Sequence, residues 1–417
     1  MAIQRSINRV YFVGAGFSAG MGYPVGQGLL PRLLDWLENR GRKGVFEHRQ
    51  GKYAPIETAA DTRARRQLVA RIHAFLSEYM KPFDPAKSRG TSRTDDWVGR
   101  IPVSSFFSVC QAISENAAIF DAEIKGKTKA RAYEGLYSEI IAAIRTYFLD
   151  LSLIGRTRRP RFAGQIFGKQ AFPSKSAAVV NFNWDEELDA LLSGAFGVDY
   201  TLEAWRNLGD DDGTALMLKP HGSVGWYDVG VRTPTTNKPA SRLKNRLGYY
   251  VASDDPRISA ESLRIRSFYN IEMPISRGGK RFGFFEAPPA IASPTFAKKF
   301  EFAEQQLIWS DVVTACSRAK EFVFLGYTLP PDDYLTRAAL AKALSNKRAG
   351  DDIKCLVIGR DIDKSFDDFQ RSFGGGLDRG RHFRNWTFGF SDSPNTFPSK
   401  HLGDAIEDEL EDARIAR

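Results

Sequence analysis

Cysteine is scarce in this chain, and the spacing of the few thiols excludes two classes of protein. The 417 residues include three cysteines, with no CxxC pair: Cys110, Cys316 and Cys355. A disulfide framework and a structural zinc site both need more thiols at closer spacing. Four histidines also lack partners at metal-ligand spacing: His48, His73, His382 and His401. We therefore expect no metal site. The histidines should be structural or exposed, and the cysteines should be buried apolar residues.

Long hydrophobic runs are also missing. No apolar stretch approaches the roughly 18 residues that span a bilayer. Arg5, Asn8 and Arg9 interrupt the apolar segment that a secretory leader would need. With 42% hydrophobic and 26% charged residues, the composition is typical of a soluble globular protein. These features predict a cytoplasmic protein without a membrane partner.

A third absence concerns the glycine-rich stretch at 10–24. Its apolar run 10–13 is followed by Gly14 and Gly16, but the next glycine is Gly20, one position too late for the dehydrogenase pattern G-x-G-x-x-G. The nearest acid, Asp35, lies inside a helical leucine pattern rather than after a second strand. A hydride-transfer enzyme is therefore disfavoured. The stretch still predicts a strand, a tight turn whose N–H groups and Ser18 hydroxyl face a diphosphate, and a helix.

The apolar segments predict an α/β fold, a Rossmann-like parallel sheet flanked by helices with a largely helical insertion after the first βα unit. Buried strands are expected at 10–13, 177–182, 216–218, 321–325 and 354–358, and helices at 29–37, 68–79, 133–151, 186–192 and 296–319. The last helix should turn Phe300, Leu307, Ile308 and Val312 inward, and Trp205 and Trp226 should be core residues. We assign 1–31, 171–230 and 285–417 to the core domain, 32–170 to the helical insertion and 231–284 to a basic insertion.

The formal charge of +9 is concentrated in one segment. Residues 231–281 contain eleven Lys and Arg against four acids, with no clear periodicity. Such a segment is either a solvated loop or a basic surface for nucleic acid or an acidic partner. By contrast, the stretch 404–412 has six acids around Ala405, Ile406 and Leu410, which predicts an amphipathic helix for a partner or subunit contact.

Each predicted strand ends in a small or polar cluster, and such ends converge at one edge of a parallel sheet. Their order resembles that of the sirtuin superfamily, and more closely its sirtuin-like branch of bacterial NAD-hydrolysing defence proteins. The turn Gly14-Ala15-Gly16-Phe17-Ser18 and Gly22-Tyr23-Pro24 match the family's phosphate turn and G-I-P. Asn183 and Asp185 match its N-x-D, His221 its H-G histidine, and Gly326-Tyr327-Thr328-Leu329 its G-T-S-L.

Two departures separate the chain from the protein deacylases of that superfamily. Val25-Gly26-Gln27 stand where deacylases have D-F-R, and the four-cysteine zinc ribbon is absent. The resemblance therefore implies an NAD⁺ glycohydrolase that depletes NAD⁺ in antiphage (abortive infection) defence, acts as a homo-oligomer, and is gated by a partner such as a HerA-type ATPase. The alternatives are protein deacylation, ADP-ribosyl transfer, or a non-catalytic NAD-, ADP-ribose- or nucleic-acid-binding subunit.

The resemblance also implies roles for individual residues. Asn183 and His221 are the expected catalytic pair, because an amide can orient water or a ribose hydroxyl and an imidazole can accept a proton at neutral pH. The residues expected to bind NAD⁺ are Gly14, Ala15, Gly16, Phe17, Ser18, Pro24, Asp185, Gly326, Tyr327, Thr328 and Gly359. Alternatively, the Asn183–Asp185 segment is a helix N-cap, and Asp332 and Asp333 start a helix.

Overall fold

The structure of the protein is a computed structural model. It describes residues 6–19, 21–39, 59–80, 98–116, 130–155, 176–193, 198–202, 214–228, 247–251, 264–267, 272–274, 289–292, 303–347, 353–360, 365–373, 375–385 and 402–415. Predictions that fall elsewhere, including those for His48, His401, Trp205 and Phe300, lie outside these residues.

Seven parallel strands form the central sheet, in the order β12-β11-β10-β1-β2-β4-β3. They are β1 (Arg9–Val13), β2 (Ala177–Asn181), β3 (Val198–Asp199), β4 (Ala215–Leu218), β10 (Glu321–Leu325), β11 (Lys354–Gly359) and β12 (Phe383–Asn385). The chain builds outward from β1 through β2 and β4, then crosses to β10 on the other side of β1. This is the doubly wound Rossmann-like order, with its switch point between β1 and β10. The predicted fold class is confirmed.

Both faces of the sheet are buried, which explains the nearly continuous apolar strand sequences. Tyr11 and Val13 point to one face, and Val10 and Phe12 point to the other. Helices α10 (Ala303–Arg318), α11 (Tyr334–Ser345) and α12 (Phe366–Ser372) cover the Phe12 face. On α10, Ile308 and Val312 are buried as predicted, but Leu307 is 51% exposed, so its predicted inward position is wrong.

The Tyr11 face is covered by α8 (Glu187–Ser193) and α14 (Leu402–Leu410). The predicted amphipathic helix at the acidic tail is thus present. Ile406 and Leu410 on its apolar side are buried in the core of this same chain, and Arg9 of β1 forms an ion pair with Glu407. This packing corrects the expectation that the apolar side of this helix contacts a partner.

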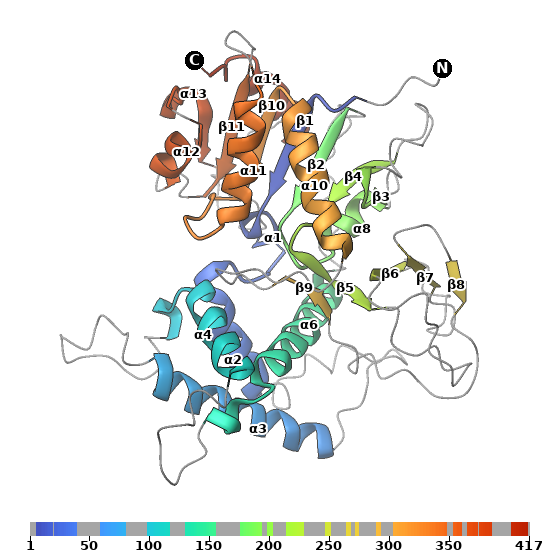
Figure 1. Ribbon diagram of the computed structural model, residues 1–417, viewed down its shortest axis with the longest axis vertical. Helices are drawn as coiled ribbons and strands as arrows, with labels where there is room; N and C mark the ends of the chain where they lie inside the picture. The colour runs from blue at the N-terminus through green and yellow to red at the C-terminus, as the bar shows by residue number, and fades with distance from the viewer. Residues whose placement is uncertain are drawn as a thin grey trace, which may run out of the picture.

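A group of helices lies beyond the carboxyl ends of the strands (Figure 1). It contains α2 (Leu29–Asn39), α3 (Ala59–Phe75), α4 (Val103–Glu115) and α6 (Leu136–Gly155), with shorter helical turns at Gly26–Gly28, Leu76–Met80, Val98–Arg100 and Ala130–Tyr133. Rings of Phe75, Tyr79, Phe106 and Tyr133 pack edge to face or stacked at its centre. The helices predicted at 29–37, 68–79 and 133–151 are therefore present.

A second, antiparallel sheet has the order β8-β7-β6-β5-β9. Its strands are β5 (Gly222–Asp228), β6 (Leu247–Val251), β7 (Arg264–Ser267), β8 (Glu272–Pro274) and β9 (Pro289–Ile291). Three of them lie within the basic segment, whose sequence shows no clear periodicity. Strand propensity depends strongly on neighbouring strands, so strands as short as these leave little sequence signal. The rest of this segment and its side chains lie outside the described residues.

The remaining general predictions concern single side chains and membrane segments. Trp226 and all three cysteines are buried, as predicted. His382 is buried between backbone oxygens of Asp378 and Arg414, whereas His73 pairs with Glu38 at the surface. Within the described ranges, no helix combines the length and apolar character that a membrane crossing requires.

Candidate functional site

Strand register places the ends of three neighbouring strands at one level of the sheet. Val13, the last residue of β1, pairs with Leu325 of β10 on one side and with Asn181 of β2 on the other. Gly14, Gly326 and Phe182 therefore leave the sheet together. In a doubly wound sheet this edge, at the switch point, is where ligands bind.

The glycines at this edge allow two turns to pack against each other. A Cβ on Gly14 would lie 2.7 Å from the Gly326 oxygen, and one on Gly16 would lie 2.8 Å from the same atom. Gly326 itself has φ +60, in the left-handed region that favours glycine. Glycine is thus required at these positions first of all by the close contact between the turns that follow β1 and β10.

The N–H groups of the glycine turn are largely used inside the chain. We predicted that they would face a diphosphate, but Gly14 N donates to Leu325 O at 3.0 Å and Gly16 N to Gly326 O at 3.0 Å. Phe17 N donates to Gly14 O at 2.9 Å. Ala15 and Gly16 are partly exposed, so the backbone of this turn is accessible at the sheet edge. The N–H groups of Gly14, Gly16 and Phe17 are already engaged and are not available to a ligand.

Asn183 is fixed against this turn. Its Nδ2 donates to Gly14 O and to Ser18 Oγ, both at 3.0 Å, and its backbone N donates to Asn181 Oδ1 at 3.0 Å. Because a carbonyl oxygen can only accept, Gly14 determines which end of the amide is Nδ2. Asn183 and Ser18 are both buried. The structure thus brings Asn183 together with Gly14 and Ser18, which lie 169 and 165 residues before it in sequence.

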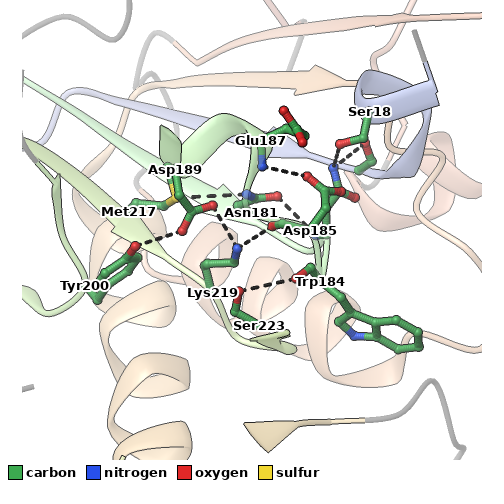
Figure 2. Close-up of polar contacts among 12 residues, drawn as sticks. Ser18, Asn181, Trp184, Asp185, Glu187, Asp189, Tyr200, Met217, Lys219 and Ser223 are labelled. Carbon is green, nitrogen blue, oxygen red and sulfur yellow. Dashed lines mark hydrogen bonds and ion pairs between the residues drawn. The ribbon is translucent and has the colours of Figure 1, made fainter. Parts of the chain in front are cut away.

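Asp185 follows two residues later and caps a helix. Its Oδ1 accepts from Glu187 N at 3.1 Å at the start of α8, as the N-cap alternative predicted (Figure 2). The carboxyl is fully buried, and this burial raises its pKa from 3.8 to about 6. Lys219 and a hydrogen bond with Ser18 oppose the rise in pKa, and the neighbouring Glu187 adds to it.

The sequence analysis missed Lys219, which joins two strand ends. Its Nζ donates to the backbone oxygen of Asp185 at 2.7 Å and pairs with Asp189 Oδ2 at 2.8 Å, while Tyr200 donates to Asp189 Oδ1 at 2.8 Å (Figure 2). The ammonium is completely buried. A lysine directly after the apolar run 215–218 was the available signal, because a lysine at the end of a buried strand needs a partner.

His221 lies two residues beyond Lys219 and is partly exposed. Its ring is 5.0 Å from the Phe182 ring and 6.1 Å from the Trp309 ring, centroid to centroid. Its Nε2 is 3.7 Å from Asp333 Oδ2. Asp333 immediately precedes α11, as predicted for a residue at a helix start, but no sequence pattern indicates that it faces His221.

The other expected NAD⁺-binding residues divide into two groups. Tyr327 belongs to the site, because its ring stacks on Phe182 with centroids 4.4 Å apart and its hydroxyl donates to Asp333. Thr328 beside it is exposed. Three others are buried: the Phe17 side chain in the core, Pro24, and Gly359 at the end of β11.

No metal-binding cluster is present in the part of the chain that the structure describes, where three or more His, Cys, Asp or Glu side chains never meet in a suitable group. The candidate site is therefore a set of amide, imidazole, hydroxyl and carboxylate groups. Such groups can orient a water molecule and accept a proton.

The raised pKa of Asp185 predicts a pH dependence of stability. A carboxyl whose folded pKa of about 6 exceeds its ordinary 3.8 favours the folded state when protonated, and this contribution is lost as the pH rises through 6. Asp185→Asn removes this loss, so its free energy of unfolding relative to wild type should increase by roughly 3 kcal/mol between pH 4 and pH 7. Urea unfolding at a series of pH values measures the difference. A difference that does not change with pH would contradict the burial argument.

In comparisons with protein-family models and with curated proteins, the chain has no match to either. The geometry of the site and the resemblance of its motifs therefore carry the functional argument.

Proposed function

We propose that this protein is an NAD⁺ glycohydrolase of the sirtuin-like kind, which cleaves NAD⁺ to nicotinamide and ADP-ribose. The observation that carries the proposal is the fixed amide of Asn183, which lies against Gly14 and Ser18 beside the switch point of a Rossmann-like sheet. His221 follows the end of β4, on the far side of β2 from β1. A nucleotide at this edge would meet both side chains.

The proposed reaction requires little acid catalysis. The bond between the ribose C1′ and the pyridinium nitrogen breaks, and its electron pair neutralises the ring, so nicotinamide leaves without a proton. A water oxygen bonds to C1′, and the water's proton passes to His221. Asn183 orients this water or a ribose hydroxyl through its amide oxygen, since its Nδ2 is already engaged. The remaining contribution is positioning, which a buried, hydrogen-bonded amide supplies well.

Incubation of the purified chain with NAD⁺ tests the proposal directly. We expect equimolar nicotinamide and ADP-ribose by chromatography, and loss of both products in Asn183→Ala and in His221→Ala. Nicotinamide release that depends on an acylated peptide would instead indicate a deacylase, and transfer to protein would indicate an ADP-ribosyltransferase. NAD⁺ binding without turnover would favour the non-catalytic alternative.

The biological setting follows from the resemblance. We propose that NAD⁺ depletion serves antiphage defence and that a homo-oligomer or a HerA-type ATPase controls it. Expression of wild type and of Asn183→Ala in cells, with measurement of cellular NAD⁺ after phage infection, tests this extension. Equal NAD⁺ levels in the two strains would exclude it.

A further inference from the structure

Asp333 is a buried carboxylate whose position is not explained by helix capping. It occupies the residue before α11 and is 6% exposed, yet its side chain makes no capping hydrogen bond to the helix backbone. Burying a carboxylate is costly unless other groups satisfy it. The partners of this carboxylate therefore indicate what it does.

Two hydroxyl groups hold one oxygen of Asp333. Tyr327 donates to Oδ2 at 2.6 Å, and Thr336 donates to the same atom at 2.9 Å. Burial, together with the nearby Asp333 charge, raises the pKa of Tyr327 well above its ordinary value, so its hydroxyl keeps its proton and remains a donor. Hydrogen bonds of this kind favour the ionised carboxylate.

The segment that carries Asp333 is held in an uncommon backbone conformation. Leu329 has φ +50 and is completely buried. Arg337 of α11 donates to the Leu329 oxygen at 2.6 Å and to the Pro330 oxygen at 3.2 Å, and it pairs with Asp368 of α12. A residue in this conformation persists only where its surroundings enforce it, and such residues cluster at functional sites.

The surroundings of His221 on its other sides are mostly aromatic. Phe182 follows β2, and Trp309 belongs to α10. The charged groups on the elements around the ring are Asp332, Asp333, Arg337 and Lys342 from α11 and its preceding loop, Glu304, Asp311 and Arg318 from α10, and Lys219, Asp185 and Glu186 after β4 and β2. Lys219 is engaged by Asp189 and the Asp185 backbone, and Asp311 accepts from Leu202 N. Asp333 is the described carboxylate that forms an ion-pair contact with the His221 ring.

We propose that Asp333 is a positioning residue for His221, which holds the imidazole in place and stabilises the imidazolium that forms when His221 accepts a proton. The catalytic part of this inference rests on the proposed hydrolysis of NAD⁺. The 3.7 Å between His221 Nε2 and Asp333 Oδ2 exceeds the upper limit of about 3.2 Å for a hydrogen bond. Catalytic contacts of this kind commonly shorten when substrate binds.

The kinetic test compares three variants in the NAD⁺ assay. Asp333→Asn should lower kcat by roughly 10- to 100-fold and change KM less than about threefold. The reason is that His221 accepts a proton less readily when no carboxylate stabilises the imidazolium. Asp333→Glu should recover part of kcat by restoring the charge. Asp332→Asn removes the same charge one residue away and should retain wild-type kcat. Equal kcat in Asp333→Asn and Asp332→Asn would overturn the proposal while leaving the hydrolase function intact.

An NMR titration of histidine-labelled protein tests the contact without any activity. The chain has five histidines, and the resonance lost in His221→Gln identifies the one to follow. In Asp333→Asn the His221 pKa should fall by roughly one unit, because an opposite charge within about 4–6 Å favours the imidazolium. An unchanged His221 titration would overturn the proposal even if the protein hydrolyses no NAD⁺. A shift in Asp333→Asn without NAD⁺ turnover under any trigger or with any partner would refute the proposed function alone.

Discussion

Replacement of Asn183 by alanine is expected to reduce kcat for NAD⁺ hydrolysis by about 10³-fold, which corresponds to roughly 4 kcal/mol of transition-state stabilisation. The amide is buried and fixed at two points by Gly14 O and Ser18 Oγ, so its orientation is set before substrate binds. Alanine offers no group to orient water or a ribose hydroxyl. Single-turnover measurement of nicotinamide release gives the change in the chemical step.

The control for this prediction is a double-mutant cycle with Ser18→Ala. Ser18 accepts from Asn183, also hydrogen-bonds with Asp185, and has no catalytic role of its own in our proposal, so its removal should cost less in kcat, roughly threefold to tenfold, mainly by loosening the amide. In the double variant the two losses should not add, because without Asn183 the hydroxyl has no amide to hold. Circular dichroism and thermal unfolding establish that each variant is folded. Wild-type turnover in folded Asn183→Ala would refute the proposed mechanism.

The second large effect is expected for Gly326→Ala, which should destabilise the fold by about 4 kcal/mol or more. The new Cβ would lie 2.3 Å from Phe17 N and 2.6 Å from the Gly16 carbonyl carbon, and both are backbone atoms that cannot rotate away. The residue also has φ +60, which alanine adopts with strain. Urea unfolding monitored by circular dichroism measures the loss.

Gly28→Ala is the matched control for Gly326→Ala. Its added Cβ would have no atom within 4 Å, and Gly28 ends the short helical turn before α2. We expect a change between zero and about 1 kcal/mol of stabilisation, because alanine restricts the unfolded chain. Similar free energies of unfolding for Gly326→Ala and Gly28→Ala would show that the close packing of the two strand ends does not require glycine at position 326. Any Gly326→Ala protein that folds should also lose activity, since Gly16 donates to the Gly326 oxygen.

The outcome for single elements shows which signals in the sequence were strong. The strands β1, β2, β10 and β11 were predicted within one residue because runs of β-branched and aromatic residues are buried on both faces of a parallel sheet. The three strands in the basic segment were missed because their short sequences depend on strand neighbours. Leu307 was predicted to face inward because it is apolar. The buried side of α10 instead follows helical spacing through Ile308, Val312 and Cys316, and Leu307 lies beside it.

For the candidate site, local motifs were sufficient to select residues but not to define their contacts. Asn183, His221 and the glycine turn were chosen from short patterns that follow predicted strands. Lys219 and Asp333 were not chosen as site residues: the signal for Lys219 was its place after a buried strand, and Asp333 carries no local mark of burial. Their significance comes from partners far away in sequence, such as Asp189 for Lys219 and His221 for Asp333.

The sequence by itself determined the α/β class, the order of the strands along the chain, and the group of polar residues at the strand ends. These features depend on periodicity and on residue type, which are local properties. The tertiary structure decided the contacts of the glycine turn, where Gly14 N and Gly16 N donate to oxygens at the end of β10, because β1 and β10 become neighbours only when the sheet forms. It also decided which carboxylates are buried beside a cation or an imidazole, because burial and charge pairing depend on contacts between distant parts of the chain.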